Sequence, residues 1–280
     1  MSQLRNLFQK SAGRRHELAP TSVETGPEDL VKPAEIQEIP VVEAHLTVTS
    51  RVVCHSDPGG PAADRFRYLR MRLREQASAR KLKRLLVTSS VAQEGKSTIV
   101  VNLATVLAER GKCSVLLVEG DLHRPSLAQH LGLPGWGGLS DCLNGYTNPI
   151  SVIRRVEPLG WYLLPGGSPC DHPTELLQKP ALSDVIQNVS RYFDWILVDS
   201  PPVLPLTDAL SLRQQTDGSL LVVRAAHTGD SSVEEAIALV GKQHVVGLVL
   251  NGVDGLDKVY SKYGYYYHRN GHAAQPEKIE

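Results

Sequence analysis

The chain has 280 residues, of which 41% are hydrophobic and 21% are charged. This composition is typical of a soluble globular protein with one large domain or two small ones. Thirty basic and thirty acidic residues balance, so the composition does not suggest a nucleic-acid-binding protein. The four cysteines are widely spaced and form no CxxC pair, which argues against a zinc site and a disulfide framework and favours a reducing cytoplasm.

The sequence contains no recognisable membrane segment. No apolar run approaches the roughly 20 residues needed to span a bilayer. Residues 1–9 include charge and lack the apolar core of a secretory signal. Any association with a membrane is therefore expected to come through a partner.

The first 56 residues are expected to form a flexible N-terminal extension. Prolines lie there among charged and polar residues without sustained periodicity. A helix is predicted from about residue 60 to residue 80, with an apolar stripe of Phe66, Leu69 and Leu73. Another face of this helix carries charged residues at spacings of three and four: Asp64, Arg67, Arg70 and Arg74.

Strands and helices alternate from residue 85 onward. Buried strands are predicted at residues 85–87, 114–119, 161–164, 195–199, 220–223 and 245–250. Helix signals between them are a stop at Gly111, a first turn at Pro180 and a capping box of Ser231 and Glu234. Continuous apolar strands separated by helices predict an α/β fold, a three-layer sandwich around a mostly parallel sheet. Ligands of such sheets bind beyond the carboxyl ends of the strands.

Residues 87–98 read V-T-S-S-V-A-Q-E-G-K-S-T and predict a phosphate-binding loop between a strand and a helix. The N–H groups at the start of the helix can hold phosphate oxygens. Lys96 would reach the terminal phosphates, and the Ser97 hydroxyl would bind Mg²⁺. The expected ligands are therefore a nucleotide and Mg²⁺, and the expected nucleotide-binding residues of the loop are Gln93, Glu94, Gly95, Lys96, Ser97 and Thr98.

Three acids end predicted strands. Asp199, in W-I-L-V-D-S-P-P, is placed like the Walker B acid that holds Mg²⁺ together with the Ser/Thr of the loop. Glu119 and Asp121, in V-E-G-D-L-H-R-P, could orient or deprotonate an incoming nucleophile, and Asp121 could also join Ser97 and Asp199 at the metal. A helix cap near Pro125 is the alternative for Asp121.

Two further polar residues have two interpretations each. Asp208, in L-T-D-A-L, could cap the following helix or belong to the site. Asn251 follows the last predicted strand and could hydrogen-bond an adenine edge or belong to a plain turn.

Five of the nine tyrosines lie within eight residues near the end of the chain: Tyr260, Tyr263, Tyr265, Tyr266 and Tyr267. Neither strand alternation nor helical spacing is present, so a role in core packing is not expected. Aromatic and basic residues together can stack single-stranded bases, but the neutral composition disfavours that interpretation. The remaining hypothesis is a set of hydroxyls for modification.

The P-loop, the paired acids, D-S-P-P and the tyrosine tail together resemble the bacterial tyrosine kinases (BY-kinases), the autokinases of capsule and exopolysaccharide export. The resemblance runs from about Asp57 to Tyr267. It implies a P-loop kinase domain over residues 57–256, related to the MinD/ParA ATPases, and a flexible tail over residues 257–280. It also implies transfer of the γ-phosphate of ATP to C-terminal tyrosines of a neighbouring subunit in a ring.

Individual positions match the motifs of this family. Lys96 and Ser97 match the Walker A residues, Asp199 matches the Walker B acid, and Glu119 and Asp121 match the acid pair of the Walker A′ motif. These matches imply catalytic roles for Lys96, Glu119, Asp121 and Asp199.

The resemblance also implies partners. Asp64, Arg67 and Arg70 fall on the E-x-x-R-x-x-R helix that packs between subunits of the ring. No membrane-spanning activator is fused before the P-loop, which is typical of the split arrangement with a separate transmembrane activator, a polysaccharide co-polymerase. The kinase is then held at the inner face of the plasma membrane, and a tyrosine phosphatase opposes it.

The sequence departs from the family pattern at several positions. Ala92 and Gln93 replace Pro and Gly of the usual loop, and a positive φ at Gln93 would cost roughly 1–2 kcal/mol. Glu119 replaces Asp, His123 stands where Arg is frequent, and Asp64 shortens the interface acid. These changes are expected to leave nucleotide binding intact and to bear on the catalytic rate.

Two other functions compete with that of an autokinase. A MinD/ParA-like ATPase switch usually carries an additional Lys early in the P-loop, where this chain has Val91, and it gives the tyrosine tail no purpose. A catalytically weak, nucleotide-gated scaffold of the export machinery would be consistent with Gln93 and Glu119.

Overall fold

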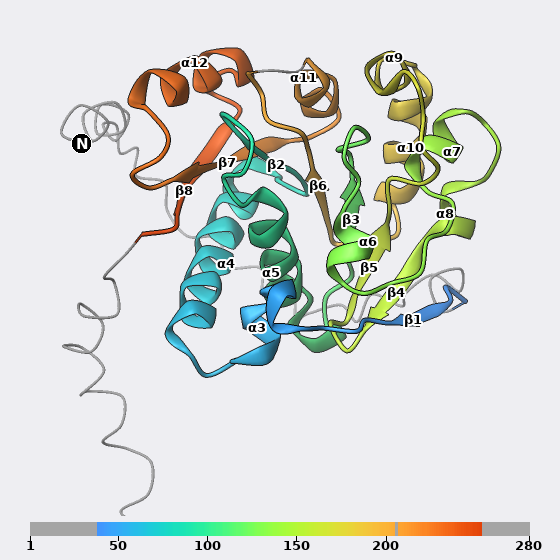
Figure 1. Ribbon diagram of the computed structural model, residues 1–280, viewed down its shortest axis with the longest axis horizontal. Coiled ribbons are helices and arrows are strands. Elements are labelled where there is room, and N and C mark those ends of the chain that lie inside the picture. Colours follow the sequence, from blue (N-terminus) through green and yellow to red (C-terminus); the bar gives the residue numbers. More distant parts are fainter. Residues whose placement is uncertain (1–37, 205–206, 254–280) are drawn as a thin grey trace, which may run out of the picture. The chain divides into compact units, whose positions relative to one another are not determined.

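An eight-stranded sheet organises the chain in the computed structural model, which describes residues 38–204 and 207–253 (Figure 1). The strands lie in the order β1 (Val41–Glu43), β4 (Arg154–Glu157), β5 (Trp161–Leu164), β3 (Val115–Glu119), β6 (Trp195–Asp199), β2 (Arg84–Ser89), β7 (Gly218–Arg224) and β8 (Val245–Asn251). All neighbours run parallel except β4 and β5, which are antiparallel. The predicted α/β fold with a mostly parallel sheet is therefore confirmed.

Helices cover both faces of the sheet (Figure 1). One face carries α3 (Val53–Ser56), α4 (Pro61–Arg80) and α5 (Lys96–Ala108), with the short segments η1 (Val48–Ser50), η2 (Glu109–Gly111) and α6 (Leu127–His130) beside them. The other face carries α7 (Leu139–Leu143), α8 (Pro149–Val152), α9 (Pro173–Leu177), α10 (Ala181–Ser190), α11 (Asp208–Arg213) and α12 (Asp230–Val240).

The two cores follow from the alternation of side chains along the strands. Leu85 and Val87 of β2 pack with α4 and α5, whereas Leu86, between them, faces the core under α10. Both faces of each central strand are buried, which explains why these strands read as continuous apolar runs. The predicted stripe of Phe66, Leu69 and Leu73 on α4 also packs into the first core.

Asp217 fixes β2 beside β7. Its Oδ2 accepts hydrogen bonds from the main-chain N–H groups of Lys83 (3.0 Å) and Arg84 (2.7 Å), and its Oδ1 accepts one from Arg84 Nη2 at 2.6 Å. Burial alone would raise the pKa of Asp217, but these donors outweigh burial and lower it. The strand that leads into the P-loop is therefore clamped at its start.

Residues 38–56 differ from the expected flexible extension. β1 pairs with β4 through Val41–Glu43, and the buried Asn102 side chain accepts a hydrogen bond from Cys54 N (3.0 Å) and donates one to Arg51 O (2.9 Å). A three-residue strand is too short to show alternation, and its partners lie far away along the chain, so local periodicity could not reveal it. Residues 1–37 lie outside the described part.

Other element boundaries also differ. β4 was not predicted, because R-R-V-E at the sheet edge is largely polar. The capping box at Ser231 is wrong: α12 begins at Asp230 after Gly229, without a side-chain cap. α5 ends at Ala108, where Glu109 takes a left-handed conformation, so the helix stops before Gly111.

The charged face of α4 divides into two parts. Arg70 points toward α5, where its Nη1 donates to Val106 O at 3.0 Å and pairs with Glu109 at 3.1 Å. Asp64 and Arg67 pair with each other on the exposed side of the first turns. Arg70 thus has partners within its own subunit, whereas Asp64 and Arg67 are exposed, and the interface role of these residues stays a prediction.

Candidate nucleotide-binding and phosphoryl-transfer site

The P-loop connects β2 to α5 through two left-handed residues. Gln93 has φ 64° and Gly95 has φ 91°. The positive φ considered for Gln93 from the sequence is therefore present, with the strain of roughly 1–2 kcal/mol that a side chain brings there. At Gly95, the Asn251 amide occupies the space that a Cβ would need, so glycine is required.

Glu94 braces this loop from below. It is fully buried; its Oε2 accepts from Val91 N (2.9 Å), and its Oε1 accepts from Arg224 N (3.2 Å) and from the Thr228 hydroxyl. A buried carboxylate is tolerated only with such donors. The loop is thereby tied to the end of β7.

Asn251 completes the brace from the end of β8. Its Nδ2 donates to Glu94 O at 2.9 Å, and its Oδ1 accepts from Gly252 N at 2.9 Å. Both polar atoms of the side chain thus hold the loop and the turn. Of the two interpretations from the sequence, the turn role is seen directly, and recognition of adenine is left as a hypothesis.

Lys96, Ser97 and Asp199 converge at the start of α5. Ser97 Oγ donates to Asp199 Oδ2 at 2.8 Å, and only 9% of Lys96 and 2% of Asp199 are exposed. Burial raises the pKa of Asp199 to about 7; Lys96 and the Ser97 hydrogen bond oppose this rise, and the charges of Glu119 and Asp121 add to it. This pKa makes the protonation state of Asp199 sensitive to a bound cation.

The donor set at this point suits Mg²⁺. Asp199 Oδ1 is buried and has no hydrogen-bond partner within residues 38–204 and 207–253. A carboxylate oxygen without a partner beside a serine hydroxyl is the kind of hard oxygen pair that Mg²⁺ takes together with phosphate oxygens. The residues therefore fit the metal that the sequence predicted.

Asp121 lies near this cluster and also supports its own loop. Its charge raises the pKa of Asp199, which places the two carboxylates within electrostatic range. Its Oδ1 accepts a hydrogen bond from Arg124 N at 3.2 Å. This contact lies in the loop before α6, whose N-cap residue is Ser126, so Asp121 is not a helix cap, and its role at the metal stays a prediction.

Glu119 differs from the expected catalytic acid. Only 2% of it is exposed. Its Oε1 accepts from Ser126 N (2.5 Å) and Leu127 N (2.7 Å), and its Oε2 accepts from Gly166 N (2.8 Å). One carboxylate satisfies three main-chain donors, so Glu119 joins two loops, and its catalytic role stays a prediction. The extra methylene relative to Asp provides the reach for these contacts.

Asp208 belongs to a contact that sequence reasoning missed. It is fully buried as the first residue of α11, and its Oδ2 lies 2.7 Å from His123 Nε2. Thr207 precedes it at the helix cap position, so Asp208 is not the cap residue. His123 follows Asp121 by two residues, and the pair thus ties α11 to the loop after β3. No local pattern connects residues 85 positions apart.

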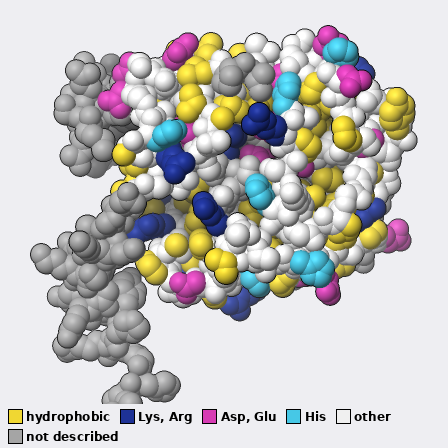
Figure 2. All heavy atoms as spheres, viewed as in Figure 1, with side chains coloured by type: hydrophobic (Ala, Val, Ile, Leu, Met, Phe, Trp, Pro, Cys, Tyr) yellow, Lys and Arg dark blue, Asp and Glu magenta, His cyan; other side chains and the backbone are white. Residues whose placement is uncertain are grey.

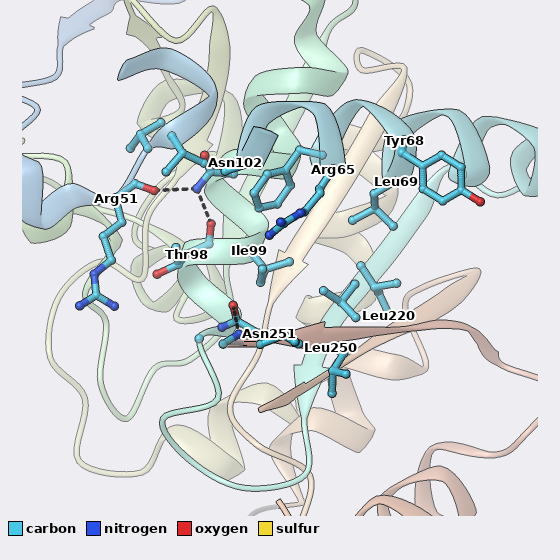
Figure 3. A pocket seen from close by; sticks show the side chains of 18 of the residues that line it. Arg51, Arg65, Tyr68, Leu69, Thr98, Ile99, Asn102, Leu220, Leu250 and Asn251 are labelled. Carbon is cyan, nitrogen blue, oxygen red and sulfur yellow. Dashed lines mark hydrogen bonds between the residues drawn. The ribbon is translucent and has the colours of Figure 1, made fainter. Parts of the chain in front are cut away.

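A cavity of about 1210 Å³ adjoins the P-loop between α4 and β8 (Figure 3). Gln93, Gly95 and Thr98 line one end of it, together with Asn251. Four of the seven expected nucleotide-binding residues therefore border this cavity, whereas Glu94 is buried beneath the loop and Lys96 and Ser97 do not line it. No helix within the described ranges is both long and apolar enough to cross a bilayer.

The P-loop, the Ser97–Asp199 contact and the parallel sheet define a P-loop nucleotide-binding protein of the MinD type. MinD of Pyrococcus horikoshii OT3 superposes with a TM-score of 0.51 at 25% identity, over 61% of this chain and 68% of that one. The kinase domain of the Escherichia coli tyrosine kinase ETK superposes with a TM-score of 0.69 over 81% of this chain and 84% of that one; at 23% identity this is a likeness of fold.

Curated relatives show which group of P-loop proteins this chain resembles. Tyrosine-protein kinase CpsD of Streptococcus pneumoniae is 31% identical over 68% of this chain and 85% of its own length. Tyrosine-protein kinase YwqD of Bacillus subtilis is 29% identical over 77% and 90%. Tyrosine-protein kinase ptk of Acinetobacter johnsonii is 28% identical over 85% of this chain, which spans only 32% of that longer protein. No protein-family model matches the chain.

The chain belongs to the family of bacterial tyrosine-protein kinases. The resemblance seen in the motifs is confirmed, and with it the class of enzyme, an ATP-dependent protein-tyrosine kinase. The tyrosines at 260–267 lie outside the described residues.

The pKa of Asp199 predicts a dependence of stability on pH in the nucleotide-free protein. The folded value of about 7 exceeds the unfolded value, so the stability contributed by the protonated group is lost as the pH rises from about 4 through 7. Compared with Asp199→Asn, the wild type should lose up to about 1.4 kcal/mol per pH unit between pH 5 and 7. Urea unfolding measures this difference, and equal slopes in both proteins would contradict it.

The contacts of Glu119 predict that it stabilises the fold. Glu119→Gln places an amide NH₂ against main-chain donors and should lower the free energy of unfolding by about 1–3 kcal/mol. Glu75→Gln, at an exposed acid of α4, is the control and should stay within about 0.5 kcal/mol of the wild type. A normal stability of Glu119→Gln with reduced kinase activity would instead support a catalytic role.

Proposed function

We propose that the chain is an autokinase that transfers the γ-phosphate of ATP to its C-terminal tyrosine cluster and thereby regulates capsule or exopolysaccharide synthesis and export. The observation that carries the proposal is the convergence of Lys96, Ser97 and Asp199 at the P-loop of a member of the tyrosine kinase family. A relative 28% identical over 79% of this chain, the succinoglycan biosynthesis transport protein ExoP of Rhizobium meliloti, supports the role in polysaccharide export; the chain spans 30% of it.

Each residue has a role in the proposed transfer. The N–H groups of the P-loop and Lys96 hold the phosphates and neutralise the charge that develops on the transferred group. Ser97 and Asp199, with Asp121 nearby, would hold Mg²⁺, which neutralises charge on the phosphate oxygens when bound. Mg-ADP in the MinD structure supports these ligands. Asp121 is the acid of the Walker A′ pair that can orient the tyrosine hydroxyl, because Glu119 is engaged with the main chain.

The proposal includes the expected organisation and partners. Residues 57–256 form the kinase domain, and residues 257–280 form the tail. The kinase assembles with copies of itself into a ring. It lies at the inner face of the plasma membrane, where a separate transmembrane protein activates it and a tyrosine phosphatase opposes it. The chimerical protein CapA2B2 is similar in structure, with 25% identity and a TM-score of 0.67 over 78% of this chain and 96% of that one.

Two observations favour the catalytically weak scaffold as a second candidate. Glu119 is engaged by three main-chain donors, and Gln93 is strained in the P-loop. In that case nucleotide binding would be normal and phosphate transfer slow.

Lys96→Met should abolish autophosphorylation with little change in the thermal unfolding temperature, because Lys96 acts on the phosphates and not in the core. Lys112→Met, at an exposed lysine after η2, is the matched control. In the active protein, phosphopeptide mapping should find phosphate on residues 260–267 and not on Tyr68 or Tyr192. Phosphate confined to either of these two, or an active Lys96→Met variant, would refute the proposal.

Self-assembly should depend on Arg67 more than on Arg70. Arg67→Ala should lower both the oligomer mass and autophosphorylation without loss of stability, because Arg67 is exposed at the start of α4. Arg70→Ala should lower the unfolding temperature, because it removes contacts with Val106 and Glu109. Light scattering before and after phosphatase treatment measures the mass, and identical masses in all samples would leave the ring without support.

A further inference from the structure

The α4–β8 groove extends the cavity away from the P-loop. Its α4 wall is Tyr68, Leu69 and Arg72, and its β8 wall is Val246, Leu248 and Leu250 (Figure 3). Tyr68 is 62% exposed, Leu250 51% and Leu248 36%. Large apolar side chains exposed next to one another mark a surface on which another segment packs.

β8 also presents an open edge beside this groove. It is the last strand in the order of the sheet, and no described strand pairs with its outer side. Unpaired N–H and C=O groups along such an edge can accept a further extended segment. The groove therefore offers both apolar contacts and main-chain hydrogen bonds to an extended chain.

The lining of the groove and the adjoining cavity is basic. Arg72 belongs to the groove, and the rest of the cavity is lined by Arg51, Arg65, Arg224 and His55, with no Asp or Glu among the described lining residues. Figure 2 shows Lys and Arg side chains among hydrophobic ones on the face that carries α4 and β8. Arginine side chains bind phosphate through bidentate hydrogen bonds. The ligand that suits this lining is an aromatic or apolar segment that carries phosphate.

Arg72 has a partner that phosphate can displace. Its Nη1 lies 2.8 Å from Glu75 Oε2, with 55% and 54% of the two side chains exposed. An exposed pair of this kind contributes little to stability, whereas a phosphotyrosine brings about −1.5 to −2 charges.

The C-terminal segment starts at this groove. Val253 lines the cavity, and residues 254–280 follow it. The seven residues from Val253 to Tyr260 can span roughly 23–25 Å, and β8 from Asn251 back to Val246 measures only about 16 Å. Asp254-Gly255 is moreover a strong signal for a two-residue hairpin turn that would return the chain along β8.

We propose that the α4–β8 groove is a phosphotyrosine-binding site for the chain's own segment 256–267, in the same molecule. The proposal rests on the proposed autokinase function for the source of the phosphate. The unmodified segment carries little negative charge that could pair with the arginines, and each phosphate adds negative charge. Phosphorylation thus moves the tail from a neighbour's catalytic site into the groove of its own subunit, where it covers the apolar wall and the edge of β8.

Synthetic peptides test the groove without kinase activity. Fluorescence anisotropy measures the binding of a peptide of residues 256–269, either unmodified or phosphorylated at Tyr260 and Tyr263, to the full-length Lys96→Met chain. The phosphorylated peptide should bind at least tenfold more tightly. Arg72→Gln and Leu250→Ser, at exposed positions, should each weaken it at least fivefold, whereas Arg80→Gln, outside the groove on the same helix, should not.

Two results would overturn the proposal. One is equal affinity for the two peptides. The other is binding that ignores Arg72→Gln and Leu250→Ser but disappears with Asp199→Asn, which would place the peptide at the P-loop. Either result would leave the autokinase proposal intact, because the peptide phosphate is introduced by synthesis.

A second measurement distinguishes the chain's own tail from that of a neighbour. Wild-type protein that has phosphorylated itself should bind the phosphopeptide at least tenfold more weakly than the same protein after phosphatase treatment. An intramolecular competitor acts at a fixed effective concentration, so this ratio should hold over a hundredfold dilution. If the two affinities became equal on dilution, the groove would bind the tail of another subunit, and binding within one molecule would be refuted.

Discussion

The parallel register of β3, β6 and β2 is the constraint on which the site depends. Val87 of β2 and Glu119 of β3 both lie opposite Asp199 of β6. β3 and β6 therefore end at the same level, β2 continues two residues further to Ser89, and the loops that follow the three strands lie side by side. The P-loop delivers Ser97 to Asp199, and the Walker A′ loop brings Asp121 within range of the same carboxylate. A slip of one residue would turn Asp199 toward the opposite face of the sheet.

Buried carboxylates hold the loops in this arrangement. Glu94 supports the P-loop from within, Glu119 joins the loops that contain Ser126 and Gly166, and Asp208 contacts His123. Each acid satisfies main-chain or side-chain donors that would otherwise be buried without partners. Acids thus have two roles at this end of the sheet: some hold the loops, and Asp199 and Asp121 face the space where charge must be neutralised.

Sequence patterns predicted the central strands, α4, α5 and the P-loop, because buried parallel strands and helix starts leave strong local signals. The strand–loop–helix context of Lys96 and Ser97 is such a signal. What could not be predicted depends on distant partners. β1 is three residues long, and the hydrogen bond between Asn251 and Glu94 joins residues 157 positions apart. Arg70 of α4 pairs with Glu109 of η2, which lies far along the chain. The main-chain contacts of Glu119 could not be predicted either, because a motif shows which residue is present and not which of its oxygens accept hydrogen bonds.

The brace between Asn251 and Glu94 also has a consequence for the order in which the protein is made. β8 is the last strand of the described chain to leave the ribosome, and Asn251 is its final residue. Until that residue has emerged and β8 has paired with β7, the main-chain carbonyl of Glu94 lacks its hydrogen-bond donor. Gly95 likewise lacks its contact with the Asn251 side-chain amide. A nascent chain that ends earlier therefore carries the complete P-loop sequence without its final support. The nucleotide site is therefore completed only after all other described elements of the fold have been synthesised.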